Sequence, residues 1–94
     1  MSMDKRQFVA RCNLEVHTLE VWLEQHWIVP EDTAAGPAFA EIDAARVQLI
    51  RDLREEMGVN DAGVDVILHL VDQLHGLRRA LAAVQDSERE SERR

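Results

Sequence analysis

Apolar residues recur at helical spacing in four separate stretches of the chain, with polar residues between them. The first stretch predicts a short helix over residues 4–12, with Phe8 and Cys12 on its apolar side. Asn13-Leu14 predicts a turn, and a second helix is predicted over residues 15–25. Because only a few residues separate the two helices, the spacing is typical of a helix-turn-helix.

The segment that follows the second helix predicts a short two-stranded wing. Residues 27–30 (WIVP) form an extended stretch that ends at a proline. Residues 31–37 have the composition of a loop. Ala38-Phe39 then provides a second short strand, which would pair with the first.

A third helix is predicted by apolar residues that fall on one helical face. They are Ile42, Ala45, Leu49, Ile50, Leu53 and Met57. Glu41 and Asp43 lie near its start, where the helix dipole favours negative charge. Gly58 follows the last periodic residue as a helix stop, and Asn60 is a favourable N-cap for a fourth helix.

The fourth and longest helix, residues 60–85, carries the clearest pattern in the chain. Its apolar residues are spaced alternately by three and four positions, at Ile67, Leu70, Leu74, Leu77, Leu81 and Val84. Such a heptad seam packs against another helix. The apolar face is wider in the first half only, through Val64, Leu68 and Val71. We therefore expect the narrow half to pair with a second copy of the chain, in a homodimer whose interface holds Leu70, Leu74, Leu77 and Leu81.

Residues 86–94 contain only polar and charged side chains. Such a stretch buries no apolar surface, so we expect a disordered polar tail there. A chain of 94 residues is long enough for one domain. The sequence thus predicts a single helical domain over residues 1–85, with residues 60–85 as its dimerisation helix.

Charge is distributed unevenly along the chain, whose formal net charge is -7. Between Asn13 and Ala45 there is no lysine or arginine. The same segment holds the carboxylates of Glu15, Glu20, Glu24, Glu31, Asp32, Glu41 and Asp43. Each contact with a DNA phosphate requires a cation or a hydrogen-bond donor, so this segment is poorly suited to nucleic acid.

The sequence gives no support to several kinds of chemistry. Cys12 is the sole cysteine, which fits a small buried residue in a reducing compartment and precludes an intramolecular disulfide. The histidines include no i, i+4 pair, so no metal site is expected. There is no glycine-rich phosphate loop, nucleophile motif or cofactor motif, so we expect a protein that is not an enzyme and has no cofactor. No apolar run approaches the roughly 18 residues of a membrane span, and no signal core follows the N-terminal charges, so a cytoplasmic location is expected.

The order of these elements, together with four segments of the sequence, resembles the MerR-type winged-helix proteins. Residues 16–22 (VHTLEVW) are similar to the start of their recognition helix, and residues 27–30 to the opening of their wing. Residues 39–43 resemble the start of the next helix, and residues 46–59 resemble that helix and its glycine stop. The resemblance covers residues 4–84. It implies an all-α, mainly helical winged helix-turn-helix with a short two-stranded wing and a long C-terminal helix.

The chain departs from the MerR pattern where those proteins contact DNA. Glu20 stands at the position of a DNA-contacting arginine, and Val21 at that of the neighbouring tyrosine. Ala38 stands at the position of the wing arginine, and His26 where the related turn usually has glycine. The loss of both cations indicates a winged-helix scaffold that recognises protein in place of DNA.

Within the MerR-like proteins, the chain is most similar to the CbpM family, which modulates DnaJ-type co-chaperones. The similarity rests on length, helix order, and Gly58-Val59-Asn60 leading into residues 64–81, with Asp72-Gln73-Leu74 among them. It implies that the partner is the J-domain of a CbpA/DnaJ-type co-chaperone, which the protein would inhibit. J-domains carry a basic helix that an acidic surface would complement. The alternative is a MerR-like DNA-binding transcriptional regulator, because the helix-turn-helix itself is retained.

The residues that we expect to contact the partner are His17, Glu20, Glu24, Trp27, Glu31 and Asp32. Glu20 and Glu24 are one helical turn apart on a face expected to be exposed, where they form either a contact surface or a solvated face. His17 lies three residues before Glu20 and is otherwise a surface or capping residue. Trp27 is either a core residue or an exposed anchor, whereas Trp22, at helical spacing with Leu19, is expected in the core.

Overall fold

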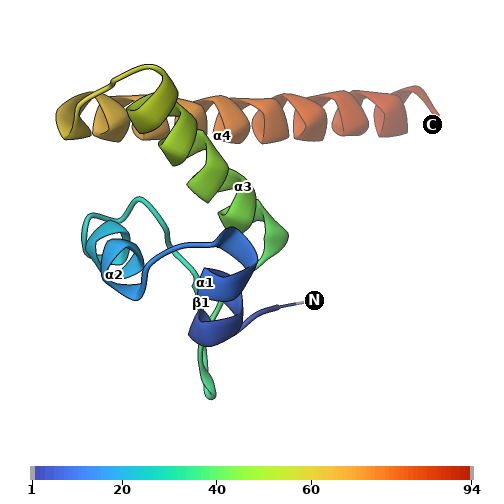
Figure 1. Cartoon of the computed structure of the whole chain (residues 1–94). Coiled ribbons are helices and arrows are strands. Elements are labelled where there is room, and N and C mark those ends of the chain that lie inside the picture. The colour runs from blue at the N-terminus through green and yellow to red at the C-terminus, as the bar shows by residue number, and fades with distance from the viewer. Residues whose placement is uncertain (1, 94) are drawn as a thin grey trace. The chain divides into compact units, whose positions relative to one another are not determined.

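The computed structural model describes residues 2–93 (Figure 1). Its elements are α1 (Lys5–Cys12), α2 (Val16–Glu24), β1 (Glu31–Thr33), β2 (Gly36–Ala38), α3 (Glu41–Arg51), a π-helical turn η1 (Asp52–Glu56) and α4 (Asp61–Glu92). This is the mainly helical fold with a short antiparallel hairpin that the sequence predicts. The chain forms two compact units, one ending at Val64 and the other beginning at Asp65.

α1 is bounded by local hydrogen bonds at both ends. Asp4 Oδ1 accepts the Gln7 N–H at 2.8 Å, and Gln7 Oε1 accepts the Asp4 N–H at 2.9 Å, which makes a reciprocal capping box. At the other end Asn13 adopts φ 51°, and the Leu14 N–H donates to the Val9 carbonyl at 2.9 Å. This left-handed cap produces the predicted turn between α1 and α2.

α2 ends in a Schellman motif, which brings the side chains of Trp22 and Trp27 into contact. His26 takes the left-handed position, with φ 62°. Its N–H donates to the Leu23 carbonyl at 3.1 Å, and the Trp27 N–H donates to the Trp22 carbonyl at 2.9 Å. The indoles of Trp22 and Trp27 supply the apolar contact that accompanies this motif, with ring centroids 6.3 Å apart. These contacts offset the cost of placing a residue with a β-carbon at positive φ.

The first strand of the wing lies later in the sequence than predicted, and the second begins two residues earlier than predicted. Its strands form within residues 31–38, where the composition predicts a loop, and residues 27–30 have no strand structure. The turn is Ala34-Ala35, and neither alanine has positive φ, while Gly36 has φ 110°. A glycine with positive φ directly after a two-residue turn is a known way to close a hairpin. Pro37 is tolerated because a two-stranded sheet has only edge strands.

Phe39 does not extend the hairpin and pairs instead with the start of the chain. The Met3 N–H donates to the Phe39 carbonyl, and the Phe39 N–H donates to the Met3 carbonyl, each at 2.7 Å. The Phe39 side chain is fully buried and stacks on Phe8, with ring centroids 4.3 Å apart. Leu19, Ile28 and the buried residues of α3 complete the core of the N-terminal unit.

α3 and the turn after it bury only part of the predicted face: Ile50 and Leu53 are buried as predicted, whereas Ala45 is exposed. Ile42 and Met57, expected on the apolar side, are 70% and 71% exposed. The buried positions of α3 and η1 are Asp43, Val47, Ile50 and Leu53. Asp43 occupies the buried face because its Oδ2 accepts the Ala40 N–H at 2.9 Å, which satisfies the helix N-terminus. The predicted stripe therefore wrongly includes Ile42 and Met57 and omits Asp43 and Val47.

α4 begins as predicted and continues further than predicted. Gly58 adopts φ 65°, and Asn60 Oδ1 accepts the Gly63 N–H at 2.8 Å, so the helix stop and the N-cap are confirmed. The helix extends to Glu92, through most of the segment expected to be a disordered tail; Arg94 lies outside the described residues. Every residue from 86 to 93 is exposed, so backbone hydrogen bonding, not burial, supports this helical end. None of the helices within residues 2–93 has the length and apolarity needed to cross a membrane.

Candidate interaction surface

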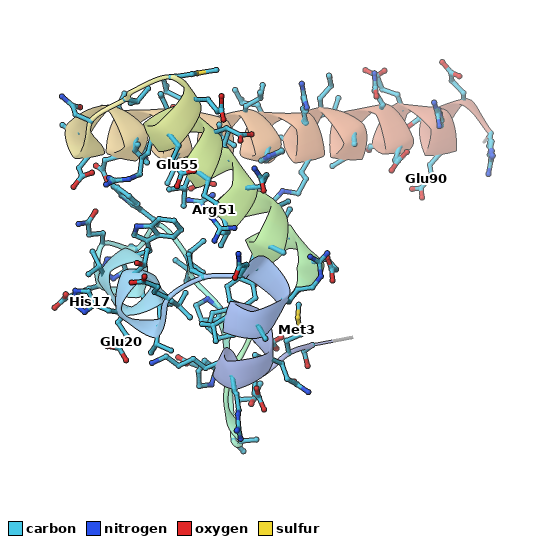
Figure 2. All side chains as sticks on the ribbon, viewed as in Figure 1. Met3, His17, Glu20, Arg51, Glu55 and Glu90 are labelled. Atoms are coloured by element: carbon cyan, nitrogen blue, oxygen red, sulfur yellow. The ribbon has the colours of Figure 1, made fainter. Side chains whose placement is uncertain are left out.

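The outward face of α2 carries three of the predicted contact residues. His17, Glu20 and Glu24 are exposed, whereas Leu19 and Trp22 on the same helix are buried. Figure 2 shows His17 and Glu20 at the periphery of the N-terminal unit. The expected exposure of Glu20 and Glu24 is therefore confirmed, and the helix is amphipathic.

Glu20 is joined to a residue that the sequence did not single out. The Lys5 ammonium of α1 donates to Glu20 Oε1 at 2.9 Å, across 15 residues of chain. This hydrogen bond, then the lysine charge and last the charge of His17 hold the pKa of the Glu20 carboxyl below its ordinary value. The contact is tertiary, so no local spacing in the sequence marks it.

The remaining carboxylates of the cation-free segment fall into two groups. Glu41 accepts from the Arg11 guanidinium at 3.0 Å, and Asp43 caps α3 from a buried position. Within residues 2–93 no ion pair is formed by Glu15, Glu24, Glu31 or Asp32. The unpaired negative charge is thus concentrated at the two ends of α2 and on β1.

The first two arginines that follow this segment, Arg46 and Arg51, donate hydrogen bonds to backbone oxygens. The Arg46 Nε–H donates to the Trp27 carbonyl, and the Arg51 guanidinium donates to the Cys12 and Asn13 carbonyls. These bonds brace the turns at the ends of α1 and α2. Neither α2 nor the hairpin carries a lysine or arginine of its own. The surface therefore lacks the cations with which winged helices hold DNA phosphates.

The other predicted contact residues lie in different environments. Glu31 and Asp32 are exposed on β1, and no hydrogen bond or ion pair within residues 2–93 joins the hairpin to α2. Trp27 is only 2% exposed, so it is a core residue and its side chain cannot serve as an anchor for a partner. The structure thus groups His17, Glu20 and Glu24, leaves the wing acids apart, and removes Trp27 from the surface.

From Leu70 onward α4 presents an apolar seam, which we define as Leu70, Leu74, Leu77, Leu81 and Val84. Their exposed fractions lie between 45% and 68%. In the first part of the helix, Val64 and Leu68 are buried and Val71 is half-buried. Large apolar residues exposed along one helical stripe are typical of a surface that packs against another helix.

The structure shows no arrangement suited to metal binding in the part of the chain that it describes. Among residues 2–93, no three His, Cys, Asp or Glu side chains are grouped so that they could hold a metal ion. Cys12 is buried, as expected, and this burial raises the pKa of its thiol above the ordinary value.

Comparison with known proteins identifies the fold family. MerR HTH family regulatory proteins match residues 3–85, a range that includes the helix-turn-helix, the wing, α3 and most of α4. A search of curated proteins and a search of solved structures return no match. On the family match, the chain belongs to the MerR HTH family of regulatory proteins.

Proposed function

We propose that this protein is a chaperone modulator of the CbpM type, which binds the J-domain of a CbpA/DnaJ-type co-chaperone and inhibits it. The observation that supports the proposal is the absence of lysine and arginine from α2 and the hairpin, where the carboxylates of Glu24, Glu31 and Asp32 are exposed. A basic partner helix is complementary to such a surface, whereas a DNA backbone is repelled by it.

Inhibition follows from competition for one helix of the partner. A J-domain uses its basic helix to engage its chaperone, so a protein that covers this helix would block that contact. In the proposed complex, the outward face of α2 contributes His17, Glu20 and Glu24. The protein acts in the cytoplasm as a homodimer, joined through the apolar seam.

Isothermal titration calorimetry with a purified CbpA-type J-domain tests the proposal. We expect binding at low salt that weakens as the ionic strength rises, because exposed charges are screened beyond about 10 Å at 0.1 M salt. The absence of heat at low salt, together with no retained complex in a pull-down, would reject the proposal. Sequence-specific retention of the protein's own promoter DNA at nanomolar protein would instead favour the transcriptional regulator.

A charge reversal locates the contact surface. Glu20→Arg with Glu24→Arg should reduce J-domain binding by about 2–5 kcal/mol if at least one of the two carboxylates is buried in the complex. The matched control is Glu88→Arg with Glu92→Arg, which makes the same charge change at the same i, i+4 spacing on the exposed end of α4. Both variants should keep the circular dichroism of the parent. Equal binding by the two folded variants would move the contact away from α2.

A further inference from the structure

The residue that pairs with Glu20 is unusual in this chain. Lys5 is the only lysine in the 94-residue sequence. It lies in the first turn of α1, and its ammonium contacts the recognition helix α2 at Glu20 Oε1. Among residues 2–93, no cation pairs with Glu24, which lies one turn further along the same face. The two carboxylates of the α2 face are therefore in different states, one neutralised and one open.

We propose that Lys5 is a charge gate on the α2 surface: it occupies Glu20 in the free protein, and a basic partner gains that carboxylate only by displacing the lysine. The inference rests on the proposed function, because it requires a cationic partner at α2. It adds the regulation of that surface, since any change that removes the Lys5 charge would open it.

The geometry of the ion pair allows displacement. The side chains of Lys5 and Glu20 are 39% and 55% exposed, and a single hydrogen bond joins them. Exposed pairs of this kind contribute little net stability because both groups remain largely hydrated. The ammonium can therefore leave Glu20 without unfolding the turn between α1 and α2, which is held by the cap at Asn13 and by Arg51.

The same geometry favours one class of competitor. Lys5 uses one carboxylate oxygen of Glu20. A guanidinium offers two parallel donors and can bind both oxygens, so an arginine on the partner is better suited than a lysine to replace Lys5. Until it is replaced, Lys5 also repels any approaching cation, which slows association. We infer that the surface selects basic helices that carry arginine at the position facing Glu20.

Substitution of the lysine tests the gate. Lys5→Met keeps most of the apolar stem and removes the charge. At low salt it should bind the J-domain about three- to tenfold more tightly, mainly through faster association, and the gain should shrink at high salt. The matched control is Arg11→Met, which removes one positive charge from the same helix but frees Glu41 instead of Glu20. Unchanged or weaker binding by Lys5→Met, or an equal gain in Arg11→Met, would overturn the inference.

Acylation of the native protein is a second way to remove the charge of Lys5, because the chain has only one lysine. N-hydroxysuccinimidyl acetate transfers its acetyl group to Lys5 Nζ, which loses a proton as N-hydroxysuccinimide is released. The treated protein should reproduce the tighter binding of Lys5→Met. Treated Lys5→Met is the control, since it reacts only at the amino terminus. A gain in that control equal to the gain in the parent would place the effect at the amino terminus and reject the gate.

A measurement without the partner separates the gate from the proposed function. In a carboxyl NMR titration, the pKa of Glu20 should rise toward its ordinary value in Lys5→Met, because the largest causes of its lowering are the lysine hydrogen bond and charge. An unchanged Glu20 titration would reject the ion pair in solution, and the gate with it, even if the J-domain binds. Failure of parent and variant alike to bind the J-domain would reject both proposals.

Discussion

The core of the N-terminal unit and the apolar seam of α4 differ in how far their apolar side chains are exposed. Within the unit that ends at Val64, Phe8, Leu19 and Phe39 are fully buried. Along α4, the residues of the apolar seam are roughly half exposed or more. Both regions are helical and contain many apolar residues, so the number of apolar residues alone does not separate them. The first region thus buries its large aromatic and leucine side chains, whereas the seam is the surface through which we propose that the homodimer forms.

Charged side chains also differ between the two regions: those of the N-terminal unit make tertiary contacts, and those at the end of α4 are exposed to solvent. In the N-terminal unit, Arg46 and Arg51 donate to backbone carbonyls, and Arg11 pairs with Glu41. These contacts join elements that are distant in the sequence. From residue 86 onward, all described side chains are exposed. Tertiary polar contacts thus hold the turns of the helix-turn-helix in place, while the end of α4 depends on its own backbone hydrogen bonds.

The largest expected effect is the loss of the aromatic stack in the N-terminal core. Phe39→Ala should lower the free energy of unfolding by about 3–5 kcal/mol, because it leaves a cavity beside Phe8. Urea denaturation followed by circular dichroism measures the change. Ile42→Ala, at an exposed apolar position of the same region, should change the stability by less than about 0.5 kcal/mol. Similar losses in the two variants would show that the region does not have the core described.

A charge introduced into the apolar seam should dissociate the proposed homodimer. Leu77→Asp places a carboxylate in the middle of the seam, and it should weaken the homodimer by roughly 2–4 kcal/mol, since an unpaired charge cannot be buried cheaply. Analytical ultracentrifugation should then report the chain mass in place of twice that mass. Arg79→Asp, two residues away and off the seam, is the control. If Leu77→Asp leaves both the mass and the melting temperature unchanged, the seam is not an interface.

The comparison also shows which parts of the fold local chemistry predicts. The ends of α1, the stop at Gly58 and the cap at Asn60 were predictable because each depends on residues within a few positions of one another. The first strand was placed too early because the hairpin closes tightly at Ala34-Ala35, with Gly36 at positive φ, inside the segment that composition predicts as a loop. The buried face of α3 and η1 was predicted only in part, at Ile50 and Leu53, because a pattern that counts apolar residues omits a buried polar cap such as Asp43.

The acidic character of the candidate surface was predictable from the sequence, but the ion pair between Lys5 and Glu20 was not. The absence of cations between Asn13 and Ala45 is visible in the sequence, and it predicts the acidic character of α2 and β1. The contact between Lys5 and Glu20 depends on how α1 and α2 pack, which no spacing along the chain specifies. Trp27 remained undecided for the same reason, until the Schellman motif placed its side chain beside Trp22 in the core.

The smallest expected effect is on the alkylation rate of a thiol, which can be compared between the N-terminal core and the seam. Cys12 lies in the N-terminal core, and its burial raises the pKa of the thiol despite the nearby Arg11 and Arg51. The thiolate is the reactive form, so alkylation of Cys12 by iodoacetamide should be several-fold slower than that of a free cysteine peptide, with its pH profile displaced to higher pH. Urea should abolish the difference. A cysteine placed in the seam, as Leu81→Cys in a Cys12→Ala background, should react at the free rate in dilute protein and more slowly as the dimer forms.

The raised pKa of the Cys12 thiol also makes the free energy of unfolding depend on pH in a defined direction. Because the folded state holds the Cys12 proton more tightly than the unfolded state, the free energy of unfolding should fall as the pH rises from the unfolded pKa of the thiol through its folded pKa. Below that window the contribution is fully present. Urea denaturation across the alkaline range, compared with Cys12→Ala, isolates this decline from the titration of other groups. If the parent and Cys12→Ala lose stability in parallel over that range, and Cys12 alkylates at the rate of the peptide, then the end of α1 is open to solvent. Cys12 would then be as accessible to solvent as the residues of the seam, and the proposed difference in burial between the two regions would not hold for the end of α1.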